Sequence, residues 1–114
     1  MTEIQKKLIR VMNELLHYYF DLSMNEISIQ LLQGDNHSTV SLSGYPAIYE
    51  NEELEKLKKT LNRPRQEELE EYYWNLIGSV DSSEQMNLVS MLIDSADVTF
   101  EDGKLTITAH RHHS

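Results

Sequence analysis

The stretch LNRPRQEELEEYYWNLIG, residues 61–78, separates two halves of the chain that follow the same plan, helix and then hairpin. Asn62 suits the end of one helix, and Pro64 suits the first turn of the next, where no N–H partner is needed. Gly78 can adopt the left-handed conformation that closes a helix. We therefore predict a helix between Pro64 and Gly78.

The segment from residue 3 to about residue 20 has the pattern of a broadly apolar helix. Thr2 and Gln5 form a capping-box pattern at its start. Two sets of apolar residues follow at helical spacing: Ile4, Leu8, Val11, Leu15, Tyr18 and Leu22, with Ile9, Met12, Leu16, Tyr19 and Phe20 alongside. Because this stripe is so wide, we expect the helix to lie across a sheet.

Two hairpins are predicted from alternating residues. In the first, segments 26–31 and 39–43 alternate, and the apolar set expected to share the core face is Ile27, Ile29, Leu31, Val40 and Leu42. In the second, Asp102 and Gly103 form a two-residue turn. Its register places Phe100 opposite Leu105, Val98 opposite Ile107, Ala96 opposite Ala109, Thr99 opposite Thr106 and Glu101 opposite Lys104.

Helical patterns also cover residues 50–61 and a segment that begins at Ser82. The predicted fold class is therefore α+β, with the order α-β-β-α-α-α-β-β and one antiparallel sheet of two hairpins under helices on one face. We expect residues 1–114 to form a single domain, with a mobile C-terminal tail from about residue 110.

Composition excludes several classes of function. Nineteen acidic against ten basic residues give a formal charge of −9, which argues against nucleic acid or an anionic membrane as a partner, because both attract a cationic face. The absence of cysteine excludes disulfides, thiolate metal sites and cysteine nucleophiles. No apolar run reaches the roughly 18 residues of a membrane span. We expect a cytoplasmic protein with no cofactor.

Arg63 and Arg65 flank Pro64 at a predicted helix N-terminus, where free backbone amides favour anions. A phosphate or carboxylate site there is one interpretation. Local pairing with Glu67, Glu68 and the neighbouring acids is the other.

Tyr72, Tyr73 and Trp74 cannot all be buried by one helix face, because successive residues lie 100° apart around a helix. A large ring at a rim is a common protein-interface anchor, and packing of the rings against the hairpins is the alternative. These three residues are the candidate protein interface.

The histidines suggest two further sites. His17 follows Glu14 by three residues on the first helix, and a histidine–carboxylate pair can transfer protons. His110, His112 and His113 could hold a divalent metal, but two of them are adjacent and a terminal tail is usually mobile, so adventitious binding is the favoured interpretation. Sequence motifs for nucleotide binding and for common hydrolases are absent, so we assign no catalytic residue and no metal ligand.

The order of helix, hairpin, helices and final hairpin resembles the histidine-kinase-like (GHKL) ATPase module. Segment 11–17 takes the place of that module's first helix, with Asn13 nearest to its magnesium-holding asparagine, and segment 98–107 looks like its closing hairpin. Ser43-Gly44-Tyr45-Pro46-Ala47 stands where the family has an Asp-x-Gly-x-Gly adenine-binding loop. The resemblance implies a shortened relative that has lost ATP binding, and no functional residue is carried over.

These observations favour a non-enzymatic protein-interaction or regulatory domain that binds a protein partner or a second copy of itself. A small-ligand, nucleotide or phosphate-binding module that uses Arg63 and Arg65 is the alternative.

Overall fold

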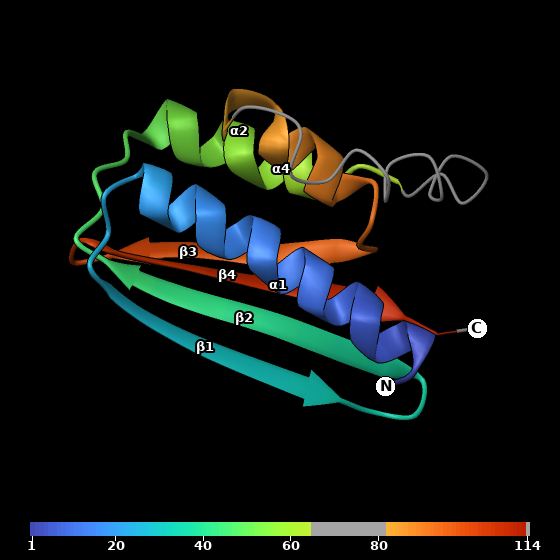
Figure 1. Ribbon diagram of the computed structural model, residues 1–114. Helices are drawn as coiled ribbons and strands as arrows, with labels where there is room; N and C mark the ends of the chain where they lie inside the picture. Colours follow the sequence, from blue (N-terminus) through green and yellow to red (C-terminus); the bar gives the residue numbers. More distant parts are fainter. Residues whose placement is uncertain (65–81, 114) are drawn as a thin grey trace.

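The structure, a computed structural model, describes residues 1–64 and 82–113. Its elements are α1 (Glu3–Asp21), β1 (Glu26–Gln33), β2 (His37–Tyr45), α2 (Asn51–Leu61), α4 (Ser82–Ser90), β3 (Ser95–Glu101) and β4 (Lys104–His112). The strands form one antiparallel sheet in the order β1-β2-β4-β3, and the helices cover one face of it (Figure 1). The predicted α+β fold class is confirmed. The helix predicted between Pro64 and Gly78 lies, from residue 65 onward, outside the described residues.

Local signals position the start of α1 and the turn of the second hairpin as predicted. The Thr2 side chain accepts a hydrogen bond from the Gln5 amide at 3.1 Å, and the Gln5 side chain accepts one from the Thr2 amide at 3.0 Å. Asp102 and Gly103 both have positive φ, 53° and 78°, as a two-residue hairpin turn requires. All five predicted cross-strand pairs of the β3–β4 hairpin are confirmed.

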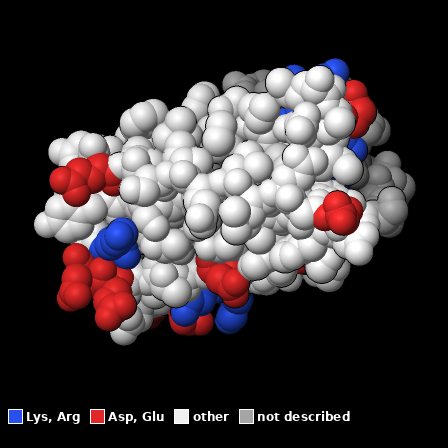
Figure 2. All heavy atoms as spheres, turned by 90° about the horizontal axis from the view of Figure 1, so that it is seen from below, with Lys and Arg blue, Asp and Glu red and all other residues white. Residues whose placement is uncertain are grey.

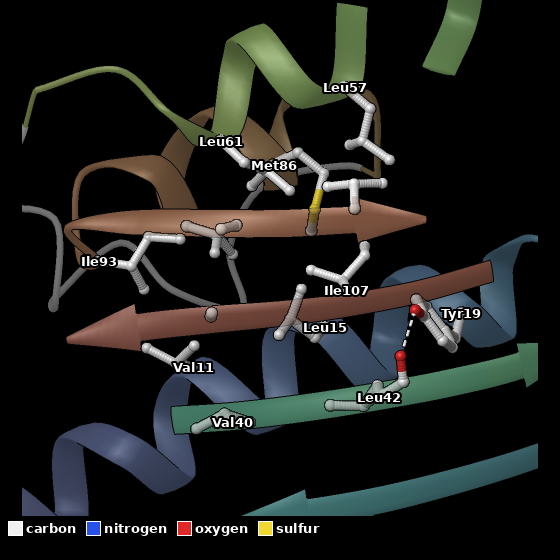
Figure 3. Close-up of a cluster of buried hydrophobic side chains, with 14 of the residues drawn as sticks. Val11, Leu15, Tyr19, Val40, Leu42, Leu57, Leu61, Met86, Ile93 and Ile107 are labelled. Carbon is white, nitrogen blue, oxygen red and sulfur yellow. Dashed lines mark hydrogen bonds between the residues drawn. The ribbon is translucent and has the colours of Figure 1, made fainter. Parts of the chain in front are cut away.

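The core lies between the sheet and the helices (Figure 3). Leu8, Val11, Leu15 and Tyr19 form the buried stripe of α1. The hydroxyl of Tyr19 lies 2.7 Å from the carbonyl oxygen of Leu42, a bond drawn in Figure 3, and 3.1 Å from that of Leu105. Tyr19 therefore ties α1 to strands β2 and β4 while its ring fills the core.

The prediction for the first hairpin was correct for the face of the sheet and wrong for burial. Ile29 pairs with Leu42 and Leu31 with Val40, so all four side chains share the helix-facing side. Val40 and Leu42 are buried, but Ile29 and Leu31 are 44% and 38% exposed. The reason is position, because β1 is an edge strand and α1 packs on β2 and α4.

Strand β4 continues past the point at which the sequence suggested a tail. Its residues pair with β2 as far as His112 opposite His37, and the His113 amide donates to the Asn36 carbonyl at 2.8 Å. The Arg111 side chain is buried and donates to the Leu92 carbonyl, just beyond the end of α4. The end of β4 is thus joined to both layers.

Candidate functional site

Arg63, one of the two predicted anion-binding residues, lies beside a hollow between α2 and α4. Its Nη1 donates to the Asn87 side-chain oxygen at 3.1 Å. The hollow has a volume of about 390 Å³, and its lining residues come from α1, the loop after β2, α2 and α4: Tyr18, Leu22, Ile48, Tyr49, Glu53, Lys56, Leu57, Thr60, Arg63, Met86 and Asn87. Arg65 lies outside the described residues.

Tyr18 of α1 and Tyr49 of the loop after β2 both line this hollow. Their hydroxyl groups are hydrogen-bonded to each other. Burial raises the pKa of Tyr18, and burial together with the hydrogen bond to Tyr18 raises the pKa of Tyr49. Both side chains are therefore neutral at physiological pH and can donate hydrogen bonds, but they do not supply a phenolate base.

Positive side chains of α2 and of Arg63, just after its C-cap, flank the same region. Lys56, Lys59 and Arg63 all line a neighbouring hollow of about 580 Å³, which also touches Glu52 and Glu55. Lys56 and Lys59 are three residues apart on α2 and so share one side of the helix, and Arg63 follows just beyond its end. The arrangement can hold an anion, although the two acids lower its net charge.

The predicted protein interface, Tyr72, Tyr73 and Trp74, lies outside the described residues. Its role stays a prediction from the sequence. The acids expected to pair with Arg63, Glu67 and Glu68, also lie there.

The structure does not join His17 and Glu14 into a catalytic pair. Glu14 is buried and accepts a hydrogen bond from Nε2 of Gln85 at 2.5 Å, whereas His17 is exposed on α1. The i+3 spacing placed the two residues on neighbouring helix rows, but Glu14 turns toward α4.

Three histidines gather on the helix-free face of the sheet, and the sequence did not reveal one of them, His37. The His37 ring stacks on His110 and on His112, with centroids 5.1 Å and 4.9 Å apart. His110 Nε2 lies 2.8 Å from a carboxylate oxygen of Asp97. His113 instead lies 2.6 Å from the Ser38 hydroxyl. In the described part of the chain, no three His, Cys, Asp or Glu side chains are placed to hold a metal ion.

A second surface combines the edge strand β1 with one side of α1, and we call it the β1–α1 surface. Its apolar side chains are Ile29 and Leu31 from β1 and Met12, Leu16 and Phe20 from α1. Phe20 is 58% exposed, and Met12 and Leu16 are partly buried. A hydrogen bond of 3.2 Å from Gln5 to Gln33 shows that this side of α1 faces β1.

The β1–α1 surface carries few charges. Glu26 is the single charged residue among the eight of β1. Figure 2, which views the molecule from the β1 side, shows a broad face without charged side chains, and the Lys, Arg, Asp and Glu residues lie mainly at its ends and lower margin. Natural edge strands are commonly protected by lysine, proline or bulges, and β1 contains neither lysine nor proline.

Among the described helices, none has the length and apolarity needed to cross a membrane. Comparison of the chain with protein-family models, with curated proteins and with solved structures gives no match.

Proposed function

We propose that this chain is a protein-binding domain, and that its β1–α1 surface takes up an extended segment of the partner as an additional strand. The observation that supports this proposal is an almost uncharged edge strand, with no described strand on its outer side, together with exposed Ile29, Leu31 and Phe20. A strand added to a sheet edge gains backbone hydrogen bonds, and pockets for alternate side chains give selectivity.

Strand β1 supplies both the backbone hydrogen-bonding groups and the apolar side chains. The outward backbone groups of β1 provide the hydrogen bonds, and the helix-facing side chains Ile29 and Leu31 form an apolar shelf beside α1. Every second side chain of an added strand would point onto this shelf. Burying both exposed side chains supplies a favourable free energy of about 1 to 3 kcal/mol.

A displayed library of random ten-residue peptides tests this function directly. We expect selected peptides to alternate apolar and polar residues, and to lose at least 30-fold in affinity for the variant Ile29→Lys/Leu31→Lys. Ile48→Lys is the matched control, because Ile48 is 92% exposed and lies outside the strands. Selected peptides that bind the double variant as tightly as the unchanged protein would contradict the proposal.

A second candidate function is the binding of a small anionic ligand beside Arg63. It is favoured by the position of Lys56, Lys59 and Arg63 around neighbouring hollows, one of which is lined by Tyr18 and Tyr49. A guanidinium group and neutral hydroxyls together suit a phosphate or carboxylate.

A thermal-shift screen with nucleotides and phosphorylated metabolites tests this candidate. We expect a stabilising shift that is lost in Arg63→Ala/Arg65→Ala. The shift should be kept in Lys104→Ala, which removes a cation at the β3–β4 turn. A shift of the same size in Arg63→Ala/Arg65→Ala would exclude this site.

A further inference from the structure

We infer that the partner of the β1–α1 surface is a second copy of this chain, joined β1 to β1 in antiparallel orientation about a twofold axis. This inference rests on the proposed protein-binding function and names its partner. The result would be one continuous eight-stranded sheet with the helices of both copies on the same face.

The hydrogen-bonding pattern of β1 determines which registers are possible. The Gly34 amide donates to the His37 carbonyl at 3.0 Å, so the even-numbered residues of β1 turn their backbone groups toward β2. Because backbone groups alternate along a strand, the odd-numbered residues Ile27, Ile29, Leu31 and Gln33 present theirs to the free edge. A symmetric pair must therefore join odd residues to odd residues.

One such register uses the whole strand. With Gln30 opposite Gln30 of the partner subunit on the twofold axis, each Ile29 lies opposite Leu31 of the partner subunit. Both residues face the helices, so four exposed apolar side chains meet in one row. On the opposite face, Ser28 then lies opposite Leu32 of the partner subunit, and no two acidic residues of β1 are paired.

The apolar side of α1 borders the space above these four side chains. Since α1 packs on β2, the two α1 helices would be three strand spacings apart, about 14 Å. Directly packed helices are about 8 to 10 Å apart, so a gap remains between them. Met12, Leu16 and Phe20 of both copies border that gap, and Ile29 and Leu31 form its floor.

Charge along α1 as a whole is also self-complementary. Its basic residues Lys6, Lys7 and Arg10 all lie in its N-terminal half and outnumber the one acid there, Glu3, which pairs with Lys6 at 3.4 Å. Asp21 and Glu26 lie at the opposite end, where α1 finishes and β1 begins. An antiparallel pair brings the basic end of each copy to the acidic end of the other, whereas an unrelated partner would need this pattern by chance.

Single-cysteine crosslinking tests the register, because the chain contains no natural cysteine. Gln30→Cys places the thiol on the twofold axis, so we expect rapid formation of a disulfide-linked dimer under mild oxidation. Gln33→Cys is the control, because its two thiols would lie about 20 Å apart at about 3.3 Å per residue. Equal crosslinking of both variants would overturn the register.

Sedimentation velocity over a range of concentrations tests the dimer itself. We expect a dimer for the unchanged protein and for Ile48→Lys. For Ile29→Lys/Leu31→Lys we expect the dissociation constant of the dimer to be at least 100-fold larger. Leu31→Pro removes an N–H that points to the free edge and spares the β1–β2 ladder. It should therefore also give a folded monomer, with folding checked by circular dichroism.

The outcomes separate this inference from the function on which it rests. A protein that stays monomeric at every concentration, yet still selects peptides that depend on Ile29 and Leu31, overturns self-pairing and leaves protein binding in place. A monomer that selects no such peptide overturns both. A dimer that persists in Ile29→Lys/Leu31→Lys and in Leu31→Pro overturns pairing through β1.

Discussion

Asn62 and Ala96 exchange two hydrogen bonds that join the end of α2 to the start of β3. The side-chain oxygen of Asn62 accepts from the Ala96 amide at 2.9 Å, and its side-chain nitrogen donates to the Ala96 carbonyl at 2.9 Å. The same nitrogen donates to the Lys58 carbonyl at 2.8 Å. One side chain thus caps a helix and fixes the position of that helix against the sheet.

Asn62→Ala should lower the free energy of unfolding by about 2 kcal/mol, because three hydrogen bonds are lost and the Ala96 backbone keeps no side-chain partner. Urea unfolding monitored by circular dichroism measures the change. Lys59→Ala, at an exposed position of the same helix, should change stability by less than about 0.5 kcal/mol. Equal effects of the two substitutions would contradict the structural role of Asn62.

The sequence revealed those parts of the fold that depend on neighbouring residues. Asn62 was predicted to end a helix because its cap is local, and the β3–β4 register followed from the Asp102–Gly103 turn. The bond from Asn62 to Ala96 was not predictable, because 34 positions separate the two residues.

Burial in the first hairpin was not predictable for a similar reason. Ile29 and Leu31 belong to an alternating run, residues 26–31, just as Val40 and Leu42 belong to another, residues 39–43. The difference between them is the strand order β1-β2-β4-β3, which leaves β1 at an edge. Strand order depends on contacts between distant segments, and alternation carries no information about it.

The candidate sites depended on distant contacts even more strongly. Arg63 was singled out beside Pro64, but the tyrosines that share its hollow come from α1 and from the loop after β2. His37 meets His110 across 73 positions. No local sequence pattern predicts either of these contacts.

Gly103→Ala should destabilise the protein by about 1 kcal/mol or more, because Gly103 has a φ of 78°, where a side chain is strained. An added Cβ would also lie 3.1 Å from the Tyr45 ring. Asp102→Asn is the matched control, since asparagine tolerates the left-handed conformation that Asp102 adopts. Thermal unfolding should show a lower midpoint for Gly103→Ala and a nearly unchanged one for Asp102→Asn.

The buried contact between Glu14 and Gln85 should appear as a coupling energy. Each side chain is the hydrogen-bond partner of the other, so Glu14→Ala and Gln85→Ala each leave a buried polar group behind. The double variant should lose less stability than the two single losses added together, by about 1 to 3 kcal/mol. Urea unfolding of the four proteins measures this difference, and simple additivity would show that the contact contributes nothing.

Alkaline pH should destabilise the protein through three tyrosines. Burial raises the pKa of Tyr18, Tyr19 and Tyr49 in the folded chain. Above about pH 10, the ordinary pKa of tyrosine, the folded chain therefore holds protons that the unfolded chain has released. The free energy of unfolding should then fall as the pH rises, since stability decreases with pH wherever the folded state binds more protons.

Tyr49→Phe should make the unfolding free energy fall less steeply with pH, because it removes one of the three groups. The change in slope should correspond to less than one proton per molecule. Tyr45→Phe is the control, at a tyrosine that is 46% exposed and belongs to the helix-free face. Urea unfolding at several pH values between 8 and 11 measures the slope, and ultraviolet absorbance of tyrosinate follows ionisation in the same samples. Because Tyr18 and Tyr49 share a hydrogen bond, the remaining Tyr18 should ionise at a different pH in Tyr49→Phe. An unchanged absorbance titration of Tyr18 would show that the two hydroxyls do not interact in solution.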